Sequence, residues 1–271
     1  MDMNALFDAA RRCLLESDPQ RKVALTRACA GEFLEGRLTA PPTPADATPI
    51  DAPGRPHRPR LIEPRKLPQR GLGSAEGRAA LVHAIAHIEF NAINLACDAV
   101  YRFRDLPDAY YGDWLQVAAE EAYHFSLLRD RLERLGYAYG DFPAHDGLWE
   151  MAARTAHDPL LRMALVPRVM EARGLDVTPG MRERFAAHGD QQTAAVLDII
   201  LRDEIGHVEA GSRWFRHLCA RRRLDPEETY FALLEQFLGN KVRCPLHKPA
   251  RLQAGFSETE LGRLEALCKR S

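Results

Sequence analysis

Two four-residue stretches, Glu121-Ala122-Tyr123-His124 and Glu204-Ile205-Gly206-His207, decide the fold that this sequence predicts. Each stretch places a carboxylate and an imidazole three residues apart. On an α-helix that spacing brings both side chains onto one face, within reach of one metal ion. With 20 Glu and 10 His among 271 residues, chance alone gives about 0.7 Glu-x-x-His matches, so one match by itself would mean little.

Each stretch is preceded by a further glutamate at a matched distance. Glu89 lies 32 residues before Glu121, and Glu171 lies 33 residues before Glu204, so the second copy is displaced by 82 or 83 residues. A four-helix bundle holds two iron or manganese ions with one Glu from each of two helices and Glu-x-x-His from each of the other two. The repeat therefore predicts a dinuclear site. Its six expected ligands are Glu89, Glu121, His124, Glu171, Glu204 and His207.

Apolar residues recur at helical spacing around each of these ligands, which predicts an all-α fold built on a four-helix bundle. Ser74 and Asp113 are expected N-caps of the first and second helices. Pro167 is expected to kink the third helix one turn before Glu171, and Gly174 is expected to end it. The four predicted ranges are 75–104, 113–135, 159–174 and 190–222, with a further short helix over 179–188.

Three more side chains are expected to support the ligands. Asp203 could accept the second N–H of a ligating histidine and fix its tautomer. Glu120 points about 100° away from Glu121 on a helix, so we expect it to be solvated or to lie behind the ligands. His87 shares a helix with Glu89 and is expected to be a buried supporting residue rather than a ligand.

The alternative is that these charges lie on solvated helix faces and that the repeat is accidental. Glu89 and Glu171 argue against it, because both lie in apolar stretches where an unpaired carboxylate would be costly to bury. Carboxylates with imidazoles suit iron or manganese and, less selectively, zinc. We expect two metal ions, iron foremost, with manganese or a mixed iron–manganese pair as alternatives.

The segments on either side of the bundle differ in composition. Prolines preclude regular helix in the middle segment, and basic residues cluster in its second half. We expect this segment to wrap the main domain; the alternative is a basic arm that contacts nucleic acid or an acidic partner. Its basic residues are Arg55, Arg58, Arg60, Arg65, Lys66 and Arg70. The expected domains are a helical hairpin over 1–36 (helices over 3–17 and 19–36), a Pro-rich linker over 37–73, the bundle over 74–222 and a helical and loop extension over 223–271.

Overall composition limits the function classes. A formal net charge of −1 excludes a chain that binds nucleic acid by charge alone. No apolar run approaches the roughly 20 residues that span a bilayer, and no leader-type apolar region opens the chain, so we expect a cytoplasmic protein without a membrane partner. The six cysteines contain no Cys-x-x-Cys pair, which argues against a zinc ribbon or an iron–sulfur cluster. Most of them are expected to be reduced.

Over about 75–222 the chain resembles the ferritin-like superfamily of di-iron carboxylate proteins. Four runs are similar to a bacterial ferritin-like family of uncharacterised function, itself similar to the tRNA hydroxylase that acts on isopentenylated adenosine. These runs are Pro53-Gly54-Arg55-Pro56, His87-Ile88-Glu89, Glu171-Ala172-Arg173-Gly174-Leu175-Asp176 and Asp203-Glu204-Ile205-Gly206-His207. The resemblance implies a di-iron site, but this fold hosts storage, electron-transfer and oxygenase chemistry alike.

The predicted metal site is therefore compatible with three functions. The first is an O₂-dependent oxidase or hydroxylase that acts on an unidentified small molecule or tRNA and takes electrons from a donor. The second is a ferroxidase or other iron-handling protein, and the third is a non-enzymatic module whose metal is structural. A tRNA substrate is favoured by the family similarity and the basic segment and opposed by the near-neutral charge. A homodimer is compatible with each function.

Overall fold

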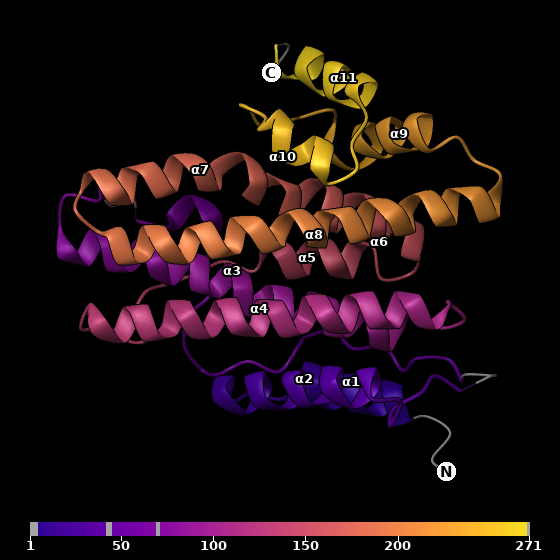
Figure 1. Cartoon of the computed structure of the whole chain (residues 1–271), viewed down its shortest axis with the longest axis horizontal. Helices are drawn as coiled ribbons and strands as arrows, with labels where there is room; N and C mark the ends of the chain where they lie inside the picture. Colours follow the sequence, from indigo (N-terminus) through magenta and orange to yellow (C-terminus); the bar gives the residue numbers. More distant parts are fainter. Residues whose placement is uncertain (1–4, 42–44, 69–70, 270–271) are drawn as a thin grey trace. The chain divides into compact units, whose positions relative to one another are not determined.

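The computed structural model is all-α, which confirms the predicted fold class (Figure 1). It describes residues 5–41, 45–68 and 71–269, and within these ranges an isolated bridge between Leu61 and Ala144 is the one β-type pairing. Some predicted features lie outside the described residues: the start of the first helix at Met3, and Pro42, Pro44 and Arg70 of the linker.

The chain divides into two compact units. Unit 1 comprises Met1–Ala153 and Arg184–Val196, and unit 2 comprises Arg154–Glu183 and Leu197–Ser271. Two helices pass from one unit into the other: α7 (Ala172–Ala187) begins in unit 2, and α8 (Gln191–Arg222) begins in unit 1. The domain ranges expected from the sequence stay predictions.

Unit 1 is built on two long helices that pack along each other, α3 and α4, with α1 packed on α3 and α2 packed on α4. Its elements are α1 (Ala5–Leu15), α2 (Pro19–Leu34), the 3₁₀-helix η1 (Pro64–Lys66), α3 (Ala75–Arg102), α4 (Asp108–Arg134) and α5 (Gly147–Arg154), whose last residue belongs to unit 2. Among the described helices, α3 has the length and apolar composition of a membrane span. However, 78% of its most apolar 18-residue window is buried inside the protein, as expected of a core helix.

Unit 2 contains a rare element. Its helices are α6 (Pro159–Leu165), the π-helix η2 (Val166–Glu171), most of α7 and α8, α9 (Pro226–Leu238), α10 (Lys248–Gln253) and α11 (Glu258–Cys268). The predicted kink at Pro167 takes the form of this π-helix. The predicted end at Gly174 is wrong, because α7 runs through Gly174 and Pro179 to Ala187.

Helix starts follow the local signals in the sequence. Each of the three Asp-Pro pairs begins a helix, with the aspartate side chain accepting a backbone N–H of the first turn and proline at the first helical position. Ser74 caps α3 by accepting the Gly77 N–H at 3.0 Å. The predicted start of α4 at Asp113 is wrong by five residues, because α4 begins at Asp108 and buries Tyr110 and Tyr111 in that added turn.

The Pro-rich linker is bound along unit 1. Its backbone exchanges two hydrogen bonds with Ala144, which donates to Arg60 O and accepts from Ile62 N–H. Gly54 donates to Leu14 O at 2.8 Å, and a Cβ at Gly54 would lie 2.1 Å from Leu15 O. Only glycine allows this approach, which explains the glycine in the Pro53-Gly54-Arg55-Pro56 run.

The cysteines are used in two ways. Cys13, Cys29, Cys97 and Cys219 are buried and free, as small core residues. Cys244 and Cys268 form a disulfide between the loop after α9 and the end of α11, a pairing that their scattered spacing did not predict.

Candidate metal centre

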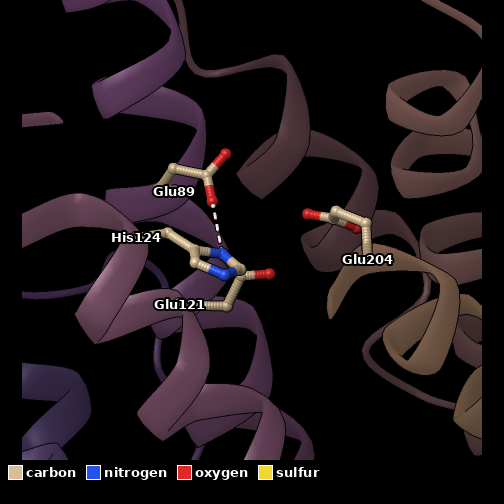
Figure 2. Close-up of side chains that lie close together, drawn as sticks. All are labelled: Glu89, Glu121, His124 and Glu204. Carbon is tan, nitrogen blue, oxygen red and sulfur yellow. Dashed lines mark hydrogen bonds and ion pairs between the residues drawn. The ribbon is translucent and has the colours of Figure 1, made fainter. Parts of the chain in front are cut away.

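Three candidate ligands of unit 1 point toward one another (Figure 2). Glu89 lies in the middle of α3, and Glu121 and His124 lie one turn apart on α4. All three side chains are buried. The packing of α3 along α4 therefore brings a carboxylate from one helix to the Glu-x-x-His pair of the other, as the sequence predicted for this half of the site.

Both carboxylates converge on one ring nitrogen of His124. Glu89 Oε2 lies 3.1 Å from His124 Nδ1, and Glu121 Oε2 lies 3.6 Å from the same atom. The two oxygens thus surround a position that demands positive charge. A proton on Nδ1 supplies that charge in the metal-free protein, and a metal ion bound by Nδ1 and both carboxylates would supply it otherwise.

Burial is the largest influence on the pKa values of Glu89 and His124. Burial raises the pKa of Glu89 to about 8, and the negative charge of Glu121 adds to the rise. Burial lowers the pKa of His124, but the hydrogen bonds and charges of Glu121 and Glu89 outweigh it and raise that pKa to about 11. At neutral pH this group therefore retains protons that a metal ion must displace.

An aromatic layer covers this half of the site within unit 1. Phe90 and Phe125 follow Glu89 and His124 in the sequence, and their ring centroids lie 5.3 Å apart. The Tyr139 ring packs on both, at 5.5 Å from Phe90 and 5.0 Å from Phe125. The three rings form one aromatic cluster within unit 1.

His87, the expected supporting residue, faces this aromatic layer. Its Nδ1 lies 2.8 Å from Tyr139 Oη, and its Nε2 lies 3.0 Å from Asn91 Nδ2. Burial lowers the pKa of His87 to about 4, so the ring is neutral at physiological pH. It orients Tyr139 and Asn91 rather than offering a nitrogen to a metal ion.

In unit 2, α8 carries the second Glu-x-x-His pair. Glu204 and His207 are both buried, and Glu204 Oε2 lies 3.8 Å from His207 Nδ1. Glu204 is also labelled in Figure 2. Within unit 1, the buried side chains of Glu89, Glu121 and His124 form a group that could hold a metal ion.

The remaining predicted site residues are less enclosed. Glu171 is the last residue of η2 and is half-buried. The carboxylate of Asp203 accepts two hydrogen bonds from Arg202, at 2.8 and 3.1 Å. Glu120 accepts from Gln116 Nε2 at 2.7 Å on the exposed side of α4. The roles of all three in metal binding stay predictions.

Sequence patterns did not reveal two further residues near the candidate ligands, Tyr139 and Arg168. Tyr139 lies in the loop after α4, 52 residues from its partner His87. The buried Arg168, three residues before Glu171, lies in a stretch with no charge pattern that marks it as buried. Tyr139 is one of three aromatic residues of this loop, with Tyr137 and Phe142, and such a group is a weak signal of packing.

Comparisons with known proteins point to a family without a known function. A family described as a protein of unknown function (DUF455) matches residues 15–262. An uncharacterized protein of Haemophilus influenzae is 50% identical over 213 residues, which cover 76% of this chain and 74% of the relative. No solved structure matches the chain.

Proposed function

The chain belongs to the DUF455 family of proteins of unknown function, and we propose that it is a dinuclear carboxylate protein of the ferritin-like type. It binds two metal ions, iron foremost, and acts as an O₂-dependent oxidase or hydroxylase. The observation that carries the proposal is the convergence of Glu89 and Glu121 on His124 Nδ1, in a buried position that demands a cation.

A purely structural role for this group would destabilise the folded protein, because all three side chains are buried. Two carboxylates and an imidazole out of contact with water cost free energy that their mutual attraction repays only in part. A cation bound by the same atoms satisfies them all. The ligand set of hard oxygens with imidazole nitrogen favours iron or manganese over softer metals.

The first turn of α8 supports the joining of the second Glu-x-x-His pair to this group. Within unit 1, Arg131 at the end of α4 donates to Asp190 at 2.9 Å and to Thr193 at 3.0 Å. From there α8 continues without a break to Arg222. Glu121 lies ten residues before Arg131, roughly 15 Å along α4, and Glu204 lies eleven residues after Thr193, roughly 17 Å along α8. Glu121 and Glu204 thus lie at similar distances along their own helices from the contact of Arg131 with Asp190 and Thr193.

Each side chain then has a stated role. Glu89, Glu121 and His124 hold one part of the centre, and Glu171, Glu204 and His207 hold the other. Two iron ions bound there supply the reduction of O₂ and the oxidation of a substrate. The aromatic layer of Phe90, Phe125 and Tyr139 keeps water from the reacting atoms.

The basic linker gives little support to a tRNA substrate. Arg55 is already paired with Asp146 at 2.7 Å within unit 1. The proposal therefore names the chemistry of the centre and leaves the substrate to experiment.

Anaerobic loading with Fe²⁺, followed by metal counting and exposure to O₂, tests the proposal. We expect two Fe²⁺ per chain and O₂ consumption in the wild type. Glu121→Gln should bind Fe²⁺ more than about 10-fold more weakly, because one ligand oxygen is lost. Glu133→Gln, at an exposed glutamate of the same helix, is the matched control and should keep both ions.

Two results would contradict the proposal. One is a wild-type protein that binds no Fe²⁺, and the other is equal metal content in Glu121→Gln and Glu133→Gln. Iron oxidation that proceeds without any substrate and leads to mineral would instead favour the iron-handling function.

A further inference from the structure

The π-helix η2 ends at Glu171, and two buried arginines of unit 2 hold the backbone on either side of that residue. A π-helix is rarer than an α-helix and occurs mostly as a single turn at functional sites. Compared with an α-helix, it contains an added residue, and each residue turns the helix by about 100°. Whether residues 166–171 are π or α therefore decides which way Glu171 faces.

Arg168 lies inside η2 and is enclosed by aromatic rings. Its Cζ lies 4.3 Å from the ring centroid of Tyr230, 4.5 Å from that of Phe256 and 5.0 Å from that of Phe215. Its Nη2 donates to Glu260 Oε1 at 2.6 Å. The side chain is thus fixed by α8, α9 and the C-terminal segment together.

The contacts of Arg168 extend to its backbone and to its partner. Tyr230 Oη donates to the carbonyl oxygen of Arg168 at 3.1 Å, so the same ring holds the turn and the side chain. The second carboxylate oxygen of Glu260 accepts the Ser257 N–H at 2.8 Å, as part of the capping box of α11. The carboxylate that binds Arg168 is therefore itself held in place.

Arg251 of α10 holds the other side of Glu171. It forms a two-point ion pair with Asp176, with Nε–Oδ1 at 2.9 Å and Nη2–Oδ2 at 2.8 Å. Its Nη2 also donates to the carbonyl of Ala172, the residue after Glu171. Its Cζ lies 5.0 Å from the ring of Phe256, which Arg168 also contacts. The two arginines share one aromatic ring.

We propose that Arg168 is a positioning residue for Glu171: with α9, α10 and α11 it keeps η2 in the π-helical form and so directs the Glu171 carboxylate toward the metal centre. This inference rests on the proposed function, in which Glu171 is a ligand. It gives the C-terminal extension a role in metal binding. Stability alone does not account for Arg168, since apolar residues often replace a buried ion pair without loss.

The test is made on the full chain with Co²⁺, which reports its coordination through its visible absorption. Arg168→Met keeps an apolar side chain of similar length in the aromatic enclosure and removes the charge. We expect it to retain the helical content of the wild type, to lose one of two bound Co²⁺ or bind it at least 10-fold more weakly, and to change the Co²⁺ spectrum. Amide hydrogen exchange over 166–172 should become faster.

Arg263→Met is the matched control. Arg263 lies on α11, the helix of Glu260, and also stacks on an aromatic ring, with its Cζ 3.8 Å from the Phe231 centroid. Its ion-pair partners are Glu227 and Glu228, in the first turn of α9. Its loss should leave Co²⁺ stoichiometry, spectrum and exchange over 166–172 unchanged.

Glu260→Gln is a second, milder variant that tests the same proposal if Arg168→Met does not fold. The single amide oxygen can still accept from Arg168, while the NH₂ group replaces the oxygen that accepts the Ser257 N–H. The variant therefore keeps the hydrogen bond to Arg168 without its charge, and it should shift the spectrum and the exchange in the same direction by a smaller amount. Wild-type-like Co²⁺ binding in both variants overturns the positioning role while the proposed function stands. A wild-type protein that binds no Co²⁺ overturns the proposed function itself, and the positioning role falls with it.

Discussion

At the residue scale, the nitrogen His124 Nδ1 accounts for the chemistry of the site. Two carboxylate oxygens face it at 3.1 and 3.6 Å in a buried position. In the metal-free protein, burial keeps the Glu89 pKa high and the carboxylates keep the His124 pKa high. A metal ion bound at His124 Nδ1 would therefore have to displace a proton.

This competition predicts that metal binding strengthens as pH rises. Below the raised pKa of Glu89, about 8, the group holds protons that the ion must displace. Each displaced proton makes the affinity rise about 10-fold per pH unit. Calorimetric titration with Co²⁺ between pH 6 and 8, in two buffers of different ionisation enthalpy, measures both the affinity and the number of protons released. An affinity that does not change over this range would contradict the prediction.

At the element scale, the π-helix depends on a close contact with α8 inside unit 2. A Cβ built on Gly211 would lie 2.3 Å from Pro167 Cβ and Cγ. Pro167 is near the start of η2, so a glycine on α8 permits the approach of this turn. The absence of a side chain at one position thus helps to set the path of the chain that leads to Glu171.

Gly211→Ala should destabilise the protein by about 1–3 kcal/mol, because the added methyl group overpacks the contact with Pro167. Gly206→Ala on the same helix is the matched control. No atom lies within 4 Å of the Cβ that it adds, so it should stabilise the protein by about 0.4–1 kcal/mol. Urea unfolding followed by circular dichroism measures both free energies. A Gly211→Ala protein as stable as Gly206→Ala would show that the contact with Pro167 is not required.

At the scale of the whole molecule, two buried histidines in unit 1 make folding sensitive to acid. Burial lowers the pKa of His83 to about 4, and that of His87 to the same value. His83 Nε2 accepts the Gly140 N–H at 2.9 Å, and protonation would turn this acceptor into a donor. Because the unfolded chain binds a proton near pH 6.5 and the folded chain does not, stability is full above that pH and is lost as pH falls toward 4.

We expect His83 to account for about 2 kcal/mol of the stability lost between pH 7 and pH 5. In His83→Gln the amide oxygen can still accept the Gly140 N–H and no longer titrates, so the loss should shrink by about that amount. His188→Gln, at an exposed histidine, controls for the removal of one histidine. The free energy of unfolding is measured for each protein at pH 7 and at pH 5. If wild type and His83→Gln lose the same stability between these pH values, His83 is not the cause of the loss.

Much of the fold could be predicted because its signals are local. The Asp-Pro pairs and Ser74 act within one turn, and a helix begins at each of them in the structure. The apolar spacing likewise involves residues within one or two turns. Errors occurred where distant packing overrides these signals. Burial of Tyr110 and Tyr111 extends α4 backward, and Asp176, held by Arg251, lies inside a helix that Gly174 was expected to end.

The candidate site likewise has a part that local spacing predicts and a part that depends on tertiary packing. The i,i+3 spacing identified Glu121 with His124 and Glu204 with His207, since both members of each pair lie on one turn of one helix. The approach of Glu89 to His124 needed the packing of α3 on α4, although the matched spacing of the repeat anticipated it. His87 was expected as a buried supporting residue, whereas its partner Tyr139 and the contact of Tyr139 with Phe125 had no counterpart in the sequence pattern.

The sequence by itself determined the helical fold class and the chemical types of the candidate ligands, because helix caps, apolar periodicity and Glu-x-x-His spacing act within a few residues. Only the tertiary structure decided that residues 166–171 form a π-helix and that an aromatic enclosure holds Arg168. Arg168 and its partner Glu260 are 92 residues apart, so no local pattern relates them. Such a pair forms only when the folded chain brings α11 onto η2. The attraction between the two charges then offsets the free energy lost when both leave water.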